Sequence, residues 1–477
     1  MGVPVPQKYD APGGNGRSVH PMQLTSEGGR RWLWRLLEPA GGGGLRDHTV
    51  LRLWDAYAAA NGAALAARRG RTARPAVPPP PPAPYDRAFF RDHMLEELLP
   101  FWARHGLDAE HGGFFTHLDR QGNVYEPSYK RAVMQARMIF AFAKGYAASG
   151  DERWRVLAEQ GVRFLLRHFW DRERGGWFRG VYRDGRPEDR QKHSADQAYV
   201  LLGLAECHRA TGDREALDHA LATRRLLDEH VWDPEHGGYY ESMNPDWSVR
   251  SSRKTICVHL DCLKALMALD AVGGGGSSAR EVEVADLIVA RFQDPRQGCV
   301  LEKFQRGWSY SPLSTWDRLE LGHNLKACWI LLDMAERHGR RDYRDVAKRL
   351  LDFSVRHGWD EERGGFYQYL FRNGRLASDE KLWWSECEGL SALARMHALS
   401  GDPIYRDLFD RLASFCVAHF VDREFGEWYT ACHGDGRVAD DRKGGDWKAA
   451  YHTVAACAYI LQHLRPRDHR IADAGPA

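Results

Sequence analysis

A short pattern occurs six times in the sequence at a nearly constant spacing. It consists of an aspartate, three residues, a glycine, usually a second glycine, and two aromatic residues, as in Asp108-Ala-Glu-His-Gly112-Gly113-Phe-Phe. Successive aspartates lie 63, 62, 61, 66 and 62 residues apart, at Asp108, Asp171, Asp233, Asp294, Asp360 and Asp422. The copy at Asp294 is degenerate, with Cys299 directly after Gly298. Six units at one period predict a fold built from repeats.

Each unit has the same order of predicted elements: an apolar helical pattern, the aspartate turn, a short hairpin and a second helix. Helices before the turns, such as 86–105, 152–168 and 343–357, mix apolar positions with many Arg and Glu residues and are expected on the outside. Helices after the turns are richer in Ala, Leu and Cys and are expected on the inside. They are predicted to begin near Lys130, Gln191, Lys254, Ser314, Lys381 and Gly445.

Twelve helices in six similar pairs bury their apolar faces best by closing into a double-layered ring. We therefore predict an all-α fold, an (α/α)6 toroid (barrel) with short β-hairpins at its rim. An open helical solenoid is the alternative, but open arrays usually need distinct polar repeats at their ends. In a toroid the inner helices converge on a central cavity, which is the expected functional site.

Residues 1–84 differ in composition from the repeats. They contain the Gly41–Gly44 run, an Ala/Arg-rich stretch and the Pro78–Pro82 tract. Such a composition buries little apolar surface and predicts a disordered extension, although a short amphipathic helix near 51–60 remains an alternative. We expect one folded domain over 85–466 and a flexible tail at 467–477.

Charge and hydropathy narrow the classes of partner. Residues 1–84 hold eleven Lys/Arg against five Asp/Glu, so of the net charge of +2 they carry +6 and the remaining residues −4. The repeats therefore show no basic footprint for nucleic acid. Because no apolar run is long enough for a membrane helix and no signal sequence is evident, we expect a cytoplasmic protein. We expect it to be a monomer or a homodimer. Nine cysteines without a C-x-x-C pair favour reduced thiols.

Polar residues within the apolar inner helices mark the expected lining of the cavity. Counted from the aspartate of each repeat, one such residue falls between positions +26 and +30 in every unit. The six are Arg137, Gln197, His259, His323, Glu388 and His452, and the aromatic residues near them are Trp383, Trp384, Trp447 and Tyr451. Similar depth in equivalent units predicts one ring of side chains, although any single histidine could instead belong to the core.

This set of side chains suits acid/base chemistry on a sugar. Histidines transfer protons near neutral pH, and indoles pack against the CH faces of a sugar whose hydroxyl groups take hydrogen bonds. Three histidines could also bind zinc, but neither a His-x-x-x-His pair nor a cysteine cluster supports a metal site. We expect no metal, no cofactor and a small-molecule sugar as the partner.

Residues 85 to about 465 resemble the N-acylglucosamine 2-epimerase superfamily, which includes mannose isomerases, mannose 2-epimerases and cellobiose 2-epimerases. The matching stretches are Gln135-Ala-Arg137, Gln197-Ala-Tyr199, the helix with His259, Gly322-His323, Trp383-Trp384-Ser-Glu-Cys-Glu388 and Trp447-Lys-Ala-Ala-Tyr451-His452. The resemblance implies a metal-free isomerase that acts on an opened sugar through a cis-enediolate.

The resemblance also implies roles for individual residues. His452 and His323 are the expected acid/base pair, with His259 assisting. Arg137 is expected to hold the carbonyl or enediolate oxygen, and Trp384 to form the platform for the sugar. The other expected substrate contacts are Gln197, Trp383, Glu388, Trp447, Tyr451 and Lys326.

Two residues depart from the family pattern. Lys326, three residues after His323, stands where the family usually has a glutamate, and Glu386 replaces a common glutamine. These two side chains could form a buried ion pair, or Lys326 could bind an anionic group of the substrate. Two other functions stay open on the same scaffold: a glycoside hydrolase, which needs two carboxylates in the cavity, and a noncatalytic sugar-binding protein.

Overall fold

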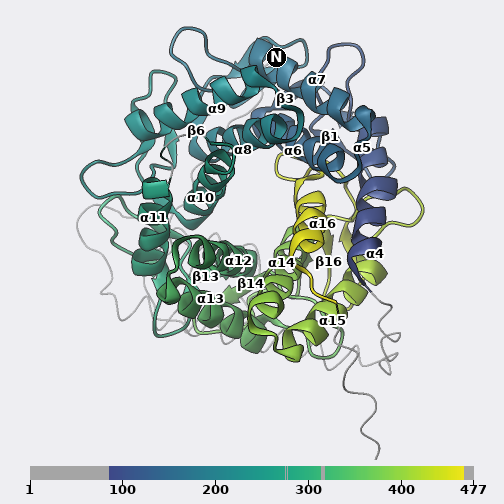
Figure 1. Cartoon of the computed structure of the whole chain (residues 1–477), viewed down its shortest axis with the longest axis vertical. Coiled ribbons are helices and arrows are strands. Elements are labelled where there is room, and N and C mark those ends of the chain that lie inside the picture. The colour runs from purple at the N-terminus through teal and green to yellow at the C-terminus, as the bar shows by residue number, and fades with distance from the viewer. Residues whose placement is uncertain (1–84, 274–275, 277, 313–316, 467–477) are drawn as a thin grey trace, which may run out of the picture. The chain divides into compact units, whose positions relative to one another are not determined.

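The computed structural model describes residues 85–466 apart from 274–275, 277 and 313–316. Within this part, outer helical segments alternate with inner helices (Figure 1). The outer segments, in which η marks a π-helical turn, are α4–η1–α5 (Arg87–Asp92, His93–Leu98, Leu99–His105), α7 (Glu152–His168), α9–η2 (Arg214–Leu226, Leu227–Val231), α11–η3 (Ser278–Leu287, Ile288–Phe292), α13–η5 (Arg341–Phe353, Ser354–Gly358) and α15 (Pro403–His419). The inner helices are α6 (Ala132–Ser149), α8 (Ser194–Thr211), α10 (Ile256–Asp270), α12 (Leu321–His338), α14 (Trp383–Ser400) and α16 (Tyr451–His463).

The inner helices form a closed ring. Each contacts the next one along the chain, and α16 returns to contact α6. Each inner helix also packs against the outer segment that follows it, and α16 packs against α4, so the last repeat is completed by the first (Figure 1). The prediction of an (α/α)6 toroid is confirmed.

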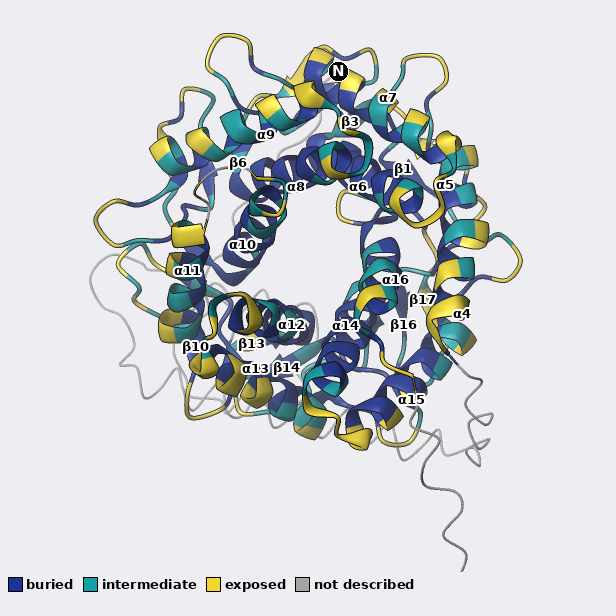
Figure 2. Ribbon diagram, in the orientation of Figure 1, coloured by how far each residue is buried: buried dark blue, intermediate teal, exposed yellow. Residues whose placement is uncertain are grey.

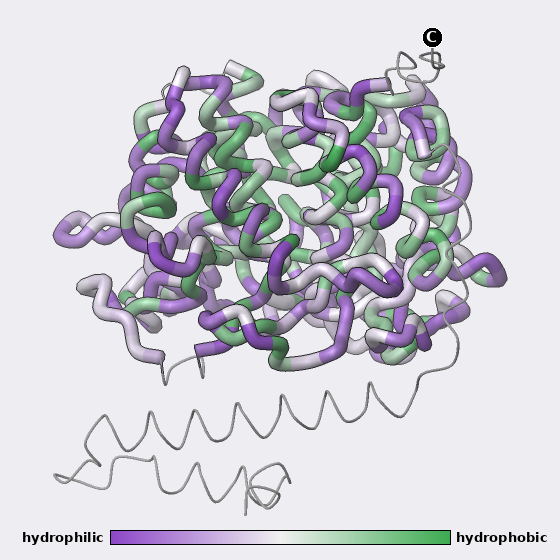
Figure 3. The backbone as a smooth tube through the Cα atoms, turned by 90° about the horizontal axis from the view of Figure 1, so that it is seen from below, coloured by the Kyte–Doolittle hydropathy of each residue, from purple (hydrophilic) through white to green (hydrophobic). Residues whose placement is uncertain are grey.

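The two layers differ in burial as their compositions predict. Exposed positions lie on the outward faces of the outer helices, whereas the inner helices are buried along most of their length (Figure 2). Seen from the side, the loops that project from the ring are mostly hydrophilic (Figure 3). The outer helix α13, for example, buries an apolar stripe with spacings of three and four residues: Tyr343, Val346, Ala347, Leu350 and Leu351.

Capping residues set the ends of several helices. An aspartate accepts a backbone N–H at the start of four outer helices, namely Asp86 at α4, Asp151 at α7, Asp213 at α9 and Asp402 at α15. A glycine with φ between 66° and 79° follows four inner helices, namely Gly150, Gly212, Gly339 and Gly401. Glycine adopts this left-handed conformation without a steric penalty, so these positions stop each inner helix and start a tight turn outward.

Short antiparallel strands join each repeat to the next, because the strand before an inner helix pairs with the hairpin of the following repeat. In one such pair Lys130 of β3 lies opposite Val181 of β4. The described pairings are β1 (His117–Leu118) with β2 (Val124–Glu126); β3 (Tyr129–Arg131), β4 (Gly180–Tyr182) and β5 (Pro187–Asp189) in that order; β6 (Lys192–His193), β7 (Ser242–Met243) and β8 (Val249–Ser251) in that order; β9 (Lys254–Thr255) with β12 (Lys303–Phe304); β10 (Gln293–Asp294) with β11 (Cys299–Val300); β13 (Arg318–Glu320) with β14 (Tyr369–Phe371); and β15 (Lys381–Leu382), β16 (Ala431–Cys432) and β17 (Val438–Asp440) in that order.

The repeat aspartate is the centre of a buried ion pair. Asp108 pairs with the buried ammonium of Lys130 at 2.8 Å, and a lysine 21 residues after the aspartate makes the same pair in four other repeats, at Lys192, Lys254, Lys381 and Lys443. In the degenerate copy Asp294 pairs with Arg372 of the next hairpin. Arg120 of the first repeat pairs with Asp422 of the sixth at 2.9 Å, which helps to close the ring.

Two inner helices begin later than the sequence pattern indicates. α12 begins at Leu321 rather than near Ser314, which lies outside the described residues, because the residues just before Leu321 form β13 and pair with β14. α16 begins at Tyr451 rather than near Gly445, because Gly445 and Lys448 exchange backbone hydrogen bonds in a turn. The segments predicted at 1–84, including the helix near 51–60, and at 467–477 lie outside the described residues.

No helix in the described part of the chain has the length and apolarity needed to span a membrane. All nine cysteines are free thiols.

Candidate active site

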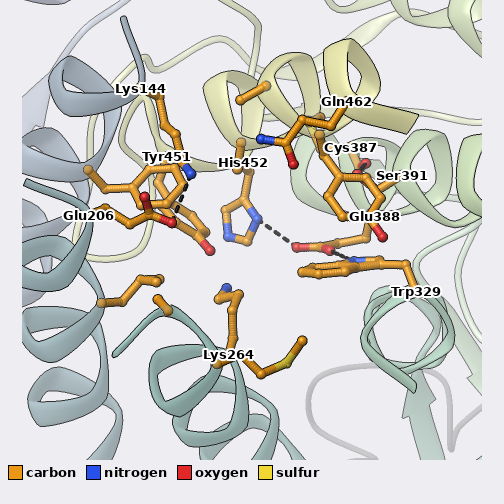
Figure 4. Close-up of a pocket in the computed structure, with 18 of the residues that line it drawn as sticks. Lys144, Glu206, Lys264, Trp329, Cys387, Glu388, Ser391, Tyr451, His452 and Gln462 are labelled. Carbon is orange, nitrogen blue, oxygen red and sulfur yellow. Dashed lines mark hydrogen bonds and ion pairs between the residues drawn. The ribbon is translucent and has the colours of Figure 1, made fainter. Parts of the chain in front are cut away.

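The inner helices enclose a cavity of about 250 Å³ that all six of them line. It extends from His452, the second residue of α16, to residues near the C-terminal ends of the inner helices, such as Arg337 and Gln462. Figure 4 shows His452, Glu388 and Lys264 directed toward the same part of this cavity. The central cavity predicted from the repeats is therefore present.

A buried carboxylate orients His452. The Nδ1 atom of His452 lies 3.0 Å from Glu388 Oε1, while Glu388 Oε2 accepts the indole N–H of Trp329 at 2.6 Å (Figure 4). Because the carboxylate accepts a hydrogen bond, Nδ1 carries the proton and Nε2 keeps its lone pair. Burial, together with Arg137 and Lys264, lowers the pKa of His452 to about 4 in spite of Glu388. His452 is thus a neutral base at neutral pH.

A second carboxylate orients His323. Glu302, from the loop between β11 and β12, places Oε2 at 2.8 Å from His323 Nδ1, and its Oε1 accepts the backbone N–H of Glu320. Burial disfavours the charged imidazole, but Glu302, Cys257 and Glu320 outweigh this effect and raise the pKa of His323 well above its ordinary value. His323 is therefore protonated at neutral pH, in contrast to His452.

One indole contacts both histidines. The ring centroid of Trp384 lies 5.2 Å from that of His323 and 5.8 Å from that of His452. Tyr451 and the buried Trp383 pack against His452 at 4.9 and 6.0 Å. The structure thus brings together the two histidines and three of the predicted aromatic residues around one centre.

Arg137 and Trp447 form a further part of this centre. Arg137 is buried, its Nη1 donates to the Trp447 carbonyl, and its guanidinium lies over the rings of Tyr199 at 4.2 Å and Tyr451 at 5.5 Å. Among the described residues its Nε has no hydrogen-bond partner. Trp447 is 49% exposed. Arg137 is therefore held rigidly and keeps a donor for the oxygen of a ligand.

Gln197 and His259, predicted to face the cavity, bond instead to the backbone of their repeat turns. Gln197 accepts the N–H of Trp177 at 3.0 Å and donates to the Trp177 carbonyl at 2.8 Å. His259 Nε2 accepts the N–H of Tyr239 at 3.1 Å, and Nδ1 donates to the Thr255 carbonyl at 2.8 Å. Burial lowers the pKa of His259 to about 3. Because the backbone occupies both imidazole nitrogens, His259 has none left for a ligand.

The same contact recurs around the ring. In five repeats the side chain of the fourth residue of the inner helix accepts a backbone N–H from the turn. In four of them the donor directly follows the last glycine of the turn, and in the degenerate repeat it stands one position later. The pairs are Gln135 with Phe114, Gln197 with Trp177, His259 with Tyr239, Asn324 with Val300, and Glu386 with Phe366. In the sixth repeat Lys448, just before α16, donates to the Trp428 carbonyl. These residues form a structural ring that fixes the turns.

Glu386 is the carboxyl-bearing member of the structural ring, and burial raises its pKa from 4.5 to about 8. Its contribution to stability is therefore present below about pH 4.5 and is lost as the pH rises toward 8. Glu386→Gln should allow the paired contacts to N–H and C=O that Gln197 makes. We expect it to raise stability at pH 8 by roughly 1–3 kcal/mol and to flatten the dependence on pH, as thermal melting between pH 5 and about 8.5 can measure.

The reverse substitution, Gln197→Glu, is the matched control. It should lower the melting temperature, and the loss should grow as the pH rises. If Glu386→Gln instead melted below the parent protein at pH 8, the structural role assigned to this ring would be wrong.

Lys326 is buried and pairs with Asp261, not with Glu386. Its Nζ donates to Asp261 Oδ1, whereas Glu386 faces the backbone of Phe366. Burial disfavours both charges, yet Lys326 holds the pKa of Asp261 down to about 2, and Asp261 raises the pKa of Lys326 above its ordinary value. The expected pairing of Lys326 with Glu386 is therefore wrong, because the lysine reaches across to helix α10.

Sequence reasoning left out several residues of this centre, although a different count finds some of them. The sixth residues of five inner helices are Arg137, Tyr199, Asp261, Lys326 and Glu388, and they face one another or His452. Counting from the start of each helix, rather than from the repeat aspartate, would have selected Tyr199 and Asp261 instead of Gln197 and His259. Glu302 has no such signal, because it reaches His323 from a hairpin loop.

Comparison with known proteins agrees with this architecture. The model of the N-acylglucosamine 2-epimerase (GlcNAc 2-epimerase) family matches residues 113–456. The chain is 30% identical to N-acylglucosamine 2-epimerase of Mus musculus, over 78% of this chain and 91% of that protein. It is 26% identical to cellobiose 2-epimerase of Bacteroides fragilis, over 76% of this chain and 95% of that protein.

Similarity extends to solved structures. A crystal structure of D-mannose isomerase matches with a TM-score of 0.75 at 25% identity, over 81% of this chain and 100% of that chain. The relatives in both comparisons are therefore epimerases and isomerases, and the match covers nearly the whole length of each of them. This chain belongs to the N-acylglucosamine 2-epimerase family and is an isomerase.

Proposed function

We propose that the chain interconverts reducing sugars by moving the proton at C2, either epimerising an aldose or converting it to a ketose. The observation that carries this proposal is the pair of His452 and His323, which contact one indole and are each held at Nδ1 by a carboxylate. Burial lowers the pKa of His452, whereas Glu302 raises that of His323. Removal and return of a proton require one neutral and one protonated acid/base group.

In the proposed reaction the sugar opens, and Nε2 of His452 removes the proton from C2. The electron pair moves toward the carbonyl oxygen and gives a cis-enediolate, whose negative oxygen Arg137 binds. His323 supplies a proton to the intermediate. Delivery of a proton to C1, with loss of the proton from the C2 oxygen and protonation of the C1 oxygen, gives the ketose. Delivery of a proton to the opposite face of C2, with the C1 carbonyl formed again, gives the epimer. The imidazoles and the guanidinium supply all of this chemistry, so the proposal uses neither a metal nor a cofactor.

The aromatic residues are proposed to hold the sugar. Trp384 lies against both histidines, so a sugar ring or its opened chain stacked on this indole has C2 within reach of either imidazole. Trp383 and Tyr451 support His452 from the side. Trp447, which is half exposed, is proposed to cover the part of the substrate that lies farther from C2.

The contacts of the carboxylates argue against a glycoside hydrolase, which needs one carboxyl group as an acid and another as a base or nucleophile. Asp261 is paired with Lys326, and Glu388 accepts hydrogen bonds from both His452 and Trp329. A noncatalytic sugar-binding protein would have no need for two histidines with opposite charge states.

A screen in D₂O tests the proposed function. The protein is incubated with glucose, mannose, fructose, N-acetylglucosamine, cellobiose and anionic hexoses, and NMR follows the signal of the hydrogen that would exchange, which is C2–H in each aldose and C1–H in fructose. We expect loss of that signal for at least one sugar, with an epimer or a ketose as the product. Release of a monosaccharide from a glycoside without exchange would favour a hydrolase, and binding without exchange would favour a noncatalytic protein.

The partnership of Glu302 and His323 predicts a change in the pH profile. Glu302→Gln removes the charge that raises the pKa of His323, so the alkaline limb of kcat/KM should move to lower pH. The rate at neutral pH should fall by roughly tenfold or more. The pH dependence of C2 exchange measures the shift, and Glu302→Asp is the control that keeps the charge. If the alkaline limb does not shift in Glu302→Gln, Glu302 does not set the pKa of the group that acts as the acid.

A further inference from the structure

Lys264, on α10, is a buried cation at the cavity that no hydrogen bond satisfies. Its side chain is 10% exposed, and among the described residues its Nζ has no hydrogen-bond partner. The nearest carboxylate oxygen, Asp261 Oδ1, is 3.9 Å away and already accepts from Lys326. Lys264 lines the cavity together with His452, and Figure 4 shows its ammonium directed into the cavity from α10.

The groups that face Lys264 leave positive charge in excess. They come from all six inner helices and comprise Asp261 on its own helix, then Arg137, Tyr199, Lys326, Glu388, and Tyr451 with its neighbour His452. Two carboxylates thus stand against Arg137, Lys264 and Lys326. Lys326 engages Asp261, and His452 and Trp329 engage Glu388, so neither carboxylate bonds to Lys264.

A buried ammonium is unfavourable unless it is paired and hydrogen-bonded. Lys264 only shares Asp261 with Lys326 at 3.9 Å and has no hydrogen bond of its own, so the arrangement around it is incomplete without an anion. The two aromatic rings give only partial compensation, since Nζ lies 4.5 Å from the Tyr451 ring and 5.3 Å from the Tyr199 ring. Burial and the charge of Lys326 lower the pKa of Lys264 to about 7, so in the absence of an anion it is partly neutral at neutral pH.

We propose that Lys264 binds an anionic substituent of the substrate, which is then a sugar carrying a carboxylate or a phosphate ester. The inference rests on the proposed function in that the sugar is the ligand acted on by His452. Lys264 is nine residues into α10 and lies in the part of the cavity that runs toward the C-terminal ends of the inner helices. The anionic group therefore points along this cavity while C2 stays at the histidines.

Proton linkage gives a readout that does not depend on turnover. An anion next to Lys264 favours its charged form, so binding at a pH above 7 takes up a proton from the buffer. Calorimetry uses the His452→Asn protein, in which turnover is blocked, at about pH 8 in two buffers of different ionisation enthalpy. The probes are glucose, glucuronate and glucose 6-phosphate, together with their C2 epimers.

Lys264→Met is the test variant, and Lys144→Met is its matched control. Lys144 lines the same cavity but is paired with Glu206 at 2.8 Å, and Glu206 keeps Arg209 when the lysine is removed. Lys264→Met should weaken the binding of one class of anionic sugar by roughly tenfold or more and abolish the proton uptake that accompanies it. The affinity for neutral sugars should change by less than about twofold. The Lys264→Met protein should also melt at or above the parent temperature, because it loses a buried ammonium that has no hydrogen bond and only shares Asp261 with Lys326.

Each outcome decides a separate question. A loss for glucuronate alone identifies a carboxylate as the ligand, and a loss for the 6-phosphate alone identifies a phosphate. Equal losses in both lysine variants, tighter binding of neutral than of anionic sugars, or binding without proton uptake would overturn the assignment of Lys264. C2 exchange of neutral sugars only, by the parent protein, would do so as well and would leave the proposed function intact. Anion binding through Lys264 without C2 exchange of any sugar would support the assignment of Lys264 and would contradict the proposed function.

Discussion

His452→Asn is expected to reduce exchange of the C2 proton by roughly 10²–10⁴-fold, because it removes the neutral nitrogen that takes that proton. The asparagine amide can still donate to Glu388, so the melting temperature should change little. NMR of the sugar in D₂O gives the exchange rate, and the same assay in the presence of a chelator checks that no metal carries the reaction.

His259→Gln is the matched control for this variant. Glutamine already occupies the equivalent position at Gln135 and Gln197, where it bonds to the backbone of the turn. We expect His259→Gln to fold and to keep most of the exchange activity. A loss in His259→Gln as large as that in His452→Asn would contradict the division between the structural ring and the active site.

Lys326→Met should produce the largest loss of stability, about 3–5 kcal/mol, because it removes the buried hydrogen-bonded partner of the Asp261 carboxylate and leaves only Lys264 at 3.9 Å. Asp261→Asn should have a comparable effect for the opposite reason, since it strands Lys326 beside Lys264. Thermal and urea unfolding measure both, and exchange activity should fall as the charges around His452 are unbalanced.

Double substitutions test which partner Lys326 has. Lys326→Met combined with Asp261→Leu should cost clearly less than the sum of the single effects, because both charges are removed together. Lys326→Met combined with Glu386→Gln should be additive, because Glu386 bonds to Phe366 and not to Lys326. Additive effects for the pair with Asp261 would show that the ion pair contributes nothing to the folded state.

The toroid could be predicted from the sequence because its signals are local and occur six times. The turn with Asp and Gly and the contrast between inner and outer helices each recur at one period, and a ring is the compact way to bury six such units. Starts of helices were predicted less well where strand pairing or a turn replaces the first helical turn, as before Leu321 and Tyr451.

The partners of the site residues were harder to predict because they depend on packing between repeats. The sequence placed His323 and His452 correctly on the inner helices, but nothing in its spacing indicates that Glu302 bonds to His323 or that Lys326 crosses to Asp261. Polar residues two positions apart on one helix, such as His259 and Asp261, point in different directions. One of them holds the turn and the other belongs to the site.

The central claim is that the C2 hydrogen leaves as a proton to His452. It is tested most directly with a sugar that carries deuterium at C2 and is converted in ordinary water. We predict that the label is lost to solvent and that the product contains hydrogen from water at C1 or C2. A product that retained the full label, moved from C2 to C1, would mean that this hydrogen never exchanged with solvent, as in a hydride shift, and would contradict proton transfer shared between the two histidines.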